Sequence, residues 1–395
     1  MFLDGLRRRN AALIRQAIAL HQAARLPANC YVIDLDAVAA NARAIMAAAA
    51  PHALKVFAMT KQMGRNAEFC AAVQRGGIAS AVAVDMECAR ACVLEAGMRL
   101  GHLGHLVQVP RAESEAAAKL APDYWTVFNH EKAAAAAAAN AALGREQAIL
   151  ARIRAEGDTF YSGHEGGFDA VTELEGAADV IDGLAGARFA GITTFPALLY
   201  DAAARRVVPT HNLRTLERAA AALARHGRTD IEINAPGTTS AVMLDALAGA
   251  GATQVEPGHG LTGTTPLHAT RDDLPELPAV VYLTEVSHLH GGRGYCFGGG
   301  LYIDPVFPPY TPHAMVGADP DAAVKLPVEI PPPAAIDYYG MIDGPARVGD
   351  SVVFGFRPQA FFTRAFTVGI SGIASGAPVV HAIRDSWGHA VGWPG

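Results

Sequence analysis

One lysine in this sequence stands where an amine could form a covalent bond with a cofactor. Lys61 directly follows the run 54–60, which reads LKVFAMT and is typical of a buried strand. Residues just past the carboxyl ends of parallel barrel strands face the active site. Partial burial there lowers the pKa of an amine and favours Schiff-base formation. A lysine that merely extends into solvent from a strand end would occupy the same position, so location alone leaves both interpretations open.

A carboxylate followed by a glycine-rich turn ends another apolar run. Segment 253–263 reads TQVEPGHGLTG, and Glu256 stands just before the first glycine. Backbone N–H groups of such a turn can bind a phosphate. A second turn, NAPGTTS at 234–240, also follows a strand-like run. Its hydroxyl groups either cap the helix that follows or bind an oxyanion.

The segments that must position these residues alternate in type between residues 30 and 270. Short apolar runs are separated by alanine-rich helical stretches, which indicates a buried parallel sheet. About eight such units favour a (β/α)8 barrel over a doubly wound open sheet. The predicted strands lie at 30–35, 54–60, 78–84, 105–110, 125–128, 148–153, 189–195, 230–234 and 253–258.

The pattern changes after Pro266, where strand-like segments are separated by loops rich in glycine and proline. The predicted fold class is therefore α/β, a (β/α)8 TIM barrel with a C-terminal β-rich domain that is β-barrel-like. We expect an N-terminal helix packing on the β domain at 1–29, the barrel at 30–270 and the β domain at 271–395.

Composition narrows the partners and the compartment. A formal net charge of −6 without a basic stripe gives no reason to expect nucleic acid. No run of about eighteen apolar residues is present, so we expect no membrane span. Five cysteines, an odd number without CxxC spacing, favour reduced thiols and a cytoplasmic protein.

Several motifs together resemble the alanine-racemase-like, fold-type III enzymes that use pyridoxal 5'-phosphate (PLP). They are YVIDLDAVAANARAI at 31–45, FAMTKQMGRN at 57–66, HLGHLVQVP at 102–110, EPG at 256–258 and HGGRGYCFGGGLY at 290–302. The motifs at 102–110 and 290–302 and the overall length are closest to the YhfX-like subgroup. The resemblance implies PLP bound to Lys61 as a Schiff base, a small-molecule amino acid as substrate, and a homodimer with shared active sites.

The resemblance also implies the cofactor contacts. Glu256 falls where the amino-acid decarboxylase branch pairs a glutamate with the pyridine nitrogen, and where alanine racemases carry an arginine. Arg65 replaces a phosphate-binding tyrosine, and Phe195 either stacks on the ring or belongs to the core. The implied cofactor-binding residues are Lys61, Arg65, Phe195, Asn234, Thr238, Thr239, Glu256, Gly258 and His259.

A carboxylate beside the ring nitrogen favours the pyridinium, which stabilises a carbanion at Cα as a quinonoid intermediate. The leading interpretation is an amino-acid racemase, in which Lys61 serves one face and Tyr295 or Cys296 the other. The alternatives are a PLP-dependent decarboxylase, a metal-assisted D-amino-acid dehydratase or aldolase, and a non-catalytic PLP-binding or homeostasis protein. A barrel hydrolase or lyase without PLP is disfavoured by the joint presence of Lys61 and the EPG turn.

The histidines give weaker expectations. His288, His290 and Cys296 offer a metal cluster, but their spacing lacks the tight His-x-Cys pattern of the metal-dependent relatives, so we expect no metal. His102 and His105 precede or begin the predicted strand 105–110, which puts them at the stability face of the barrel. His164 follows a strand and is a candidate to face the cofactor.

Overall fold

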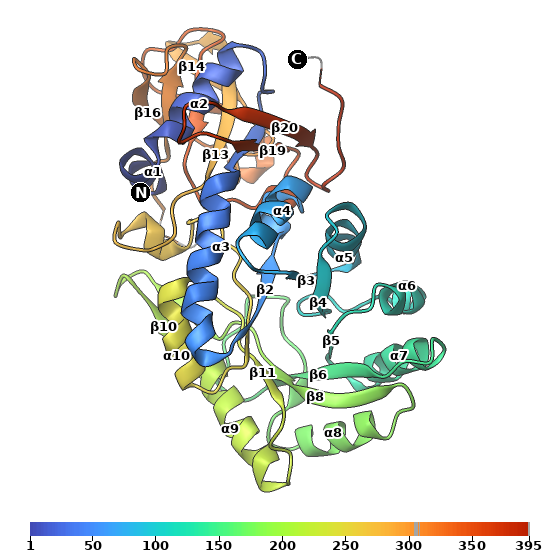
Figure 1. Cartoon of the computed structure of the whole chain (residues 1–395). Helices are drawn as coiled ribbons and strands as arrows, with labels where there is room; N and C mark the ends of the chain where they lie inside the picture. The colour runs from blue at the N-terminus through green and yellow to red at the C-terminus, as the bar shows by residue number, and fades with distance from the viewer. Residues whose placement is uncertain (304–306, 308, 394–395) are drawn as a thin grey trace.

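The structure is a computed structural model that describes every residue except 304–306, 308 and 394–395. Its larger domain is a closed barrel of eight parallel strands (Figure 1). Closure occurs where the fourth strand pairs with the fifth and the eighth with the first. In order, the strands are β2 (Lys55–Met59), β3 (Ser80–Ala83), β4 (Arg99–Leu103), β5 (Tyr124–Val127), β6 (Gln147–Arg154), β8 (Ala187–Thr193), β11 (Glu232–Asn234) and β12 (Gln254–Val255).

Helices surround these strands, which confirms the predicted TIM barrel. Their alanine-rich faces pack closely against the sheet, as α7 does by burying five residues. The helices are α3 (Leu35–Ala49), α4 (Ala67–Arg75), α5 (Met86–Arg90), α6 (Ser114–Lys119), α7 (His130–Ala141), α8 (Leu174–Asp182), α9 (His211–Arg225) and α10 (Leu244–Gly249). A short strand, β7 (Phe168–Asp169), pairs in parallel with the last two residues of β6, and a hairpin of β9 (Leu198–Asp201) and β10 (Arg206–Pro209) follows β8.

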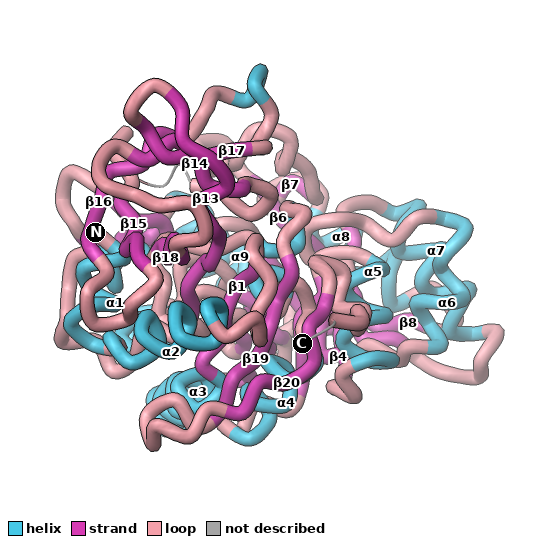
Figure 2. The backbone as a smooth tube through the Cα atoms, turned by 90° about the horizontal axis from the view of Figure 1, so that it is seen from above, coloured by secondary structure: helices cyan, strands magenta, loops and turns pink. Residues whose placement is uncertain are grey.

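The second domain is built on a mostly antiparallel sheet, seen as a cluster of strands beside the barrel in Figure 2. Six of its strands close on themselves because β14 pairs with both β17 and β13. The strands after the barrel are β13 (Val280–His290), β14 (Arg293–Phe297), β15 (His313–Gly317), β16 (Val324–Glu329), β17 (Tyr339–Ile342), β18 (Ser351–Phe354), β19 (Phe366–Ser371) and β20 (Val379–Arg384). This confirms the predicted β-rich C-terminal domain.

The N-terminal segment packs on that second domain as two helices, α1 (Phe2–Arg9) and α2 (Ala11–Gln22), instead of one. The break is at Asn10, whose side-chain oxygen accepts a hydrogen bond from the backbone of Leu13 and caps α2. Ile18 of α2 is buried in one apolar cluster with β-domain side chains such as Val353. No helix in the described part of the chain has the length and apolar character needed to cross a membrane.

Two predicted barrel strands are placed differently. Segment 30–35 contains β1 (Cys30–Asp34), which lies in the C-terminal sheet between β13 and β19. Segment 105–110 is a loop, and the strand before it is β4. Gly104 ends β4 with φ near +80°, and a Cβ there would lie 2.7 Å from the carbonyl oxygen of Thr126. Only glycine fits this turn without strain.

Candidate active site

A cavity of about 420 Å³ opens at the carboxyl ends of the barrel strands, where the C-terminal domain covers them. Barrel residues that follow β2, β4, β6, β8, β11 and β12 line it, and three residues of the C-terminal domain close one side. The chemically relevant lining residues are Lys61, Gln62, His105, Tyr161, His164, Phe195, Thr238, Thr239, Glu256, Gly258, His259, Tyr302, Arg357 and Gln359.

Lys61 lies at the first turn after β2, as the sequence predicts. Its Nζ sits 5.1 Å from the centre of the Phe361 ring, which belongs to the C-terminal domain. Burial lowers the pKa of Lys61 to about 8, and the positive charge of Arg357 acts in the same direction. A fraction of this amine is therefore neutral, and able to attack a carbonyl, near neutral pH.

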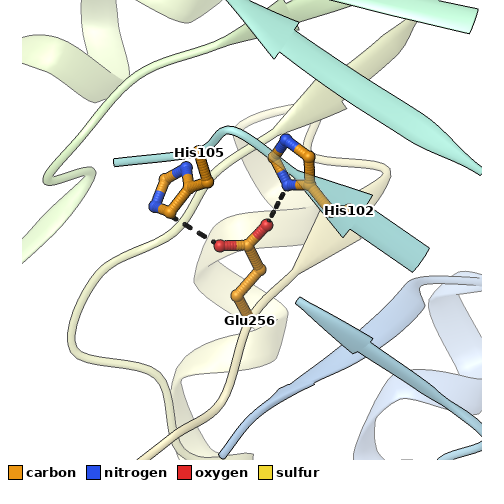
Figure 3. A group of neighbouring side chains, drawn as sticks. All are labelled: His102, His105 and Glu256. Carbon is orange, nitrogen blue, oxygen red and sulfur yellow. Dashed lines mark hydrogen bonds and ion pairs between the residues drawn. The ribbon is translucent and has the colours of Figure 1, made fainter. Parts of the chain in front are cut away.

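Glu256 lies just past the end of β12, and its two carboxylate oxygens face His102 and His105 (Figure 3). His102 Nδ1 lies 2.5 Å from Oε1, and Asn234 Nδ2 donates to the same atom at 2.9 Å. Burial raises the pKa of Glu256, but its two histidine neighbours and these hydrogen bonds outweigh burial and hold the pKa below its usual value. The carboxylate is therefore ionised at neutral pH.

The other oxygen of Glu256 has no hydrogen-bond donor among the residues that the structure describes. Oε2 is buried, and His105 Nε2 lies 3.4 Å away without forming a hydrogen bond. Burial lowers the pKa of His105 to about 3, so this imidazole is neutral. An unpaired buried carboxylate oxygen is costly. A cationic N–H in the cavity would satisfy it.

These residues fit PLP. Glu256 Oε2 offers an acceptor for a pyridinium N–H, and Lys61 offers the amine. Gly258 packs closely on the Gln62 side chain, since a Cβ there would lie 2.5 Å from Gln62 Nε2. The buried imidazole of His259 has one nitrogen, Nε2, without a partner among the described residues. The cavity is thus lined both by a glycine and hydroxyl groups that suit a phosphate and by a carboxylate that suits the ring nitrogen.

The remaining predicted cofactor contacts differ in placement. Phe195 lines the cavity and stands perpendicular to His105 with ring centres 5.5 Å apart. Thr238 and Thr239 also line it. Asn234 contributes indirectly, through its hydrogen bond to Glu256.

Arg65 does not line the cavity, contrary to its expected role as a phosphate ligand. Its buried guanidinium stacks on Phe361 and Trp387, with 5.6 and 5.3 Å to the ring centres. It lies 3.6 Å from Asp85 and donates to the carbonyl of Ser386. The chain turns at Gly64 and Arg65, which both have positive φ, and the arginine joins the barrel to the C-terminal domain.

Neither proposed second base lines the cavity of its own chain. Cys296 is buried inside the C-terminal domain, where its thiol donates to the carbonyl of Gly340. Burial raises its pKa to about 12, which is unsuited to a base. Tyr295 stacks on His288 with ring centres 4.6 Å apart. Its side chain is partly exposed, so it stays a candidate to reach the site of a second copy.

His102 and His105 were expected at the stability face of the barrel and lie instead at its active end. The correction follows from the strand position: β4 begins at Arg99, so His102 is near its carboxyl end and His105 follows it. Both contact the carboxylate of Glu256. The HLGH spacing around Gly104, which ends the strand, is the signal that could have revealed them.

Two arginines at the site were also missed. Arg357 lines the cavity from the C-terminal domain. Arg152 on β6 is buried and donates to the carbonyls of His164 at 2.7 Å and Phe195 at 3.5 Å. Burial lowers the pKa of Arg152 to about 10. It fastens two cavity-lining segments to the barrel wall.

The predicted candidates for a metal cluster do not converge. Among the described residues, the group whose ligand atoms lie within 4.8 Å of one another is His102, His105 and Glu256. His288 is stacked on Tyr295, and Cys296 points into the domain interior.

Comparison with known proteins places this architecture in a family. Residues 33–266 match the family model described as alanine racemase, N-terminal domain, and residues 281–380 match YhfX-like, C-terminal domain. The protein YhfX of Escherichia coli (strain K12) is 37% identical over 393 residues, covering 99% of this chain and 100% of YhfX.

Three solved structures share the fold at low sequence identity. D-threonine aldolase from Filomicrobium marinum has a TM-score of 0.69 and 17% identity over 92% of this chain and 96% of its own. D-threo-3-hydroxyaspartate dehydratase from Delftia sp. HT23 has a TM-score of 0.65 and 15% sequence identity, and the match covers 91% of this chain and 97% of the dehydratase. Alanine racemase of Clostridium difficile 630 has a TM-score of 0.63 and 15% sequence identity, and the match covers 91% of this chain and 99% of the racemase. The family matches confirm the resemblance found in the sequence, and the chain belongs to the alanine racemase N-terminal domain family, in its YhfX-like branch.

Proposed function

We propose that this protein is a PLP-dependent amino-acid racemase. The observation that carries the proposal is the geometry of Glu256, an ionised carboxylate with one unpaired buried oxygen in a cavity that also exposes Lys61. When bound, PLP supplies an electron sink for charge that develops at Cα of an amino acid. Glu256 sustains that sink by keeping the ring nitrogen protonated.

The residues of the chain take distinct roles around the cofactor. Lys61 holds it covalently and, once released, carries a proton to or from one face of Cα, for which a pKa of about 8 is well matched. Phe195 bounds the ring position, and Thr238, Thr239, Gly258 and His259 hold the phosphate. The C-terminal domain covers the opening with Tyr302, Arg357 and Gln359 and limits the entry of water.

A racemase also needs an acid/base on the opposite face of Cα. Tyr295 of a second copy is our candidate, because its ring is partly exposed and Cys296 is buried in its own domain. The proposed active form is therefore a homodimer with shared sites. This requirement also separates a racemase from a simple PLP-binding protein, which needs no second base.

The test is exchange of the Cα proton for deuterium, screened over L- and D-amino acids, with chiral analysis of the product. A racemase gives deuterium incorporation and both enantiomers from either one. An amino-acid decarboxylase is the second candidate, because the same Glu256 arrangement suits it, and it would release CO2. Loss of the β-substituent would indicate a dehydratase, and cleavage of the Cα–Cβ bond would indicate an aldolase. Any of these three outcomes rejects the racemase.

A further inference from the structure

Glu256 is the end of a hydrogen-bonded chain that runs into the barrel wall. His102 on β4 is fully buried, with Nδ1 2.5 Å from Glu256 Oε1 and Nε2 2.6 Å from Thr126 Oγ1 on β5. An ionised carboxylate only accepts hydrogen bonds, so the hydrogen between Nδ1 and Oε1 belongs to the histidine. On the opposite side of the ring, Nε2 forms a hydrogen bond with the Thr126 hydroxyl, and the two contacts together fix the ring plane.

We infer that His102 is a positioning residue that determines which oxygen of Glu256 faces the ligand. This inference rests on the proposed function. With donors from His102 and Asn234 both on Oε1, the carboxylate is restrained through that oxygen, and Oε2 is left without a hydrogen bond in a residue that lines the cavity. Without His102, Asn234 alone restrains the carboxylate, which can turn and lose its alignment with the ring nitrogen. Thr126 supports this geometry from the next strand.

A direct hydrogen bond between His102 and Glu256 fits this cluster better than a metal ion that both residues would bind. The ligand atoms of His102, His105 and Glu256 lie within 4.8 Å of one another, a spacing that by itself would allow a bound cation. However, nitrogen and oxygen ligands at about 2.1 Å from zinc stand roughly 3.4 Å apart in a tetrahedral site. The 2.5 Å between His102 Nδ1 and Glu256 Oε1 is a direct hydrogen bond and leaves no room for a cation between them.

The test compares two substitutions that differ in the donor they leave. His102→Asn keeps an N–H near the position of Nδ1, whereas His102→Leu removes it. We expect His102→Leu to raise the PLP dissociation constant about tenfold, equivalent to about 1.4 kcal/mol, and His102→Asn to restore most of the affinity. The second measurement is the nitrogen NMR shift of PLP labelled at the ring nitrogen, which should move toward the unprotonated value in His102→Leu and stay near wild type in His102→Asn.

A double substitution shows whether His102 acts through Glu256. In a Glu256→Gln background, His102→Leu should change affinity and the NMR shift little further, because coupled residues are not additive. His21→Leu is the matched control. It removes another buried histidine, one that bonds Ser351 in the C-terminal domain, and should lower the unfolding temperature without moving the NMR shift.

The possible results distinguish a failure of this inference from a failure of the proposed function. A wild-type protein that forms no lysine-linked PLP complex overturns both. Wild-type affinity and NMR shift in His102→Leu overturn the inference alone. The inference is also overturned if zinc raises the unfolding temperature of the wild type but not that of His102→Leu. Should His102→Leu fail to fold, Thr126→Val decides the question: a shift toward the unprotonated value supports the inference, and an unchanged shift overturns it.

Discussion

Replacing Glu256 by glutamine removes one charge from the cavity and keeps the size of the side chain. In the wild type, Oε1 accepts from His102 and Asn234, so the glutamine oxygen is expected to keep that place and its amide group to face the cavity. That amide offers a donor where the ring nitrogen needs an acceptor. A pKa shift of one unit corresponds to about 1.4 kcal/mol, and loss of an adjacent buried charge costs the pyridinium on the order of two units or more. Turnover should therefore fall by roughly two powers of ten or more, at about 1.4 kcal/mol for each tenfold change.

The assay is the rate of Cα deuterium exchange at saturating substrate, together with PLP occupancy. Occupancy should stay near normal at saturating PLP, because Lys61 and the phosphate-binding turns are untouched, although the PLP dissociation constant should rise at least as much as in His102→Leu. Glu232→Gln is the matched control: it removes a carboxylate from β11 that pairs with Lys55 outside the cavity, and it should affect stability rather than exchange. Full exchange activity in Glu256→Gln would refute the reasoning and leave Glu256 as a structural carboxylate.

Three further predictions concern other parts of the site. Lys61→Ala should abolish the link between PLP and the protein that borohydride reduction makes permanent. In the wild type, the rate of PLP loading should rise with pH through about 8, because the Lys61 amine must be neutral to react and burial lowers its pKa. A loading profile that rises only near the ordinary pKa of lysine contradicts this. Gly104→Ala should lower the free energy of unfolding by about 2 kcal/mol or more, because it forces a side chain into positive φ against a carbonyl; denaturant titration measures it, and an unchanged midpoint would disprove the steric argument. Mixing Lys61→Ala chains with Tyr295→Phe chains should restore part of the activity through hybrid dimers, and a fully active monomer at high dilution rules this out.

The parts of the fold that could be predicted are those that depend on residues close together in the sequence. That Lys61 and Glu256 lie at one cavity could be predicted, because each directly follows an apolar run that ends in a turn, and in a parallel barrel all such ends meet at one face. The change to glycine- and proline-rich loops after Pro266 likewise marks the second domain. These signals need no knowledge of which strands pair.

The misplaced elements depend on long-range pairing or on a single backbone angle. Every residue of β1 is buried, so its sequence cannot be told from that of a barrel strand. Its place is fixed by β13 and β19, more than 240 residues away. The direction of the Arg65 side chain depends on the positive φ of that residue, which the sequence pattern does not reveal. Cys296 is inside its domain because of the strand register, and a shift of one residue would exchange its place with that of Tyr295.

The histidines show how one such error hides a site. A strand at 105–110 would put His102 and His105 at the entrance of the strand, where polar residues serve stability. Because the strand ends at Gly104 instead, both histidines lie at its carboxyl end and contact Glu256. The pattern of apolar residues is compatible with either strand boundary. The glycine is therefore the informative residue, because the turn it permits brings two strands, β4 and β12, to a common group of titratable side chains. The ionisation of Glu256 then depends on neighbours more than 150 residues earlier in the chain, and a sequence motif such as EPG can identify the carboxylate without showing what holds it charged.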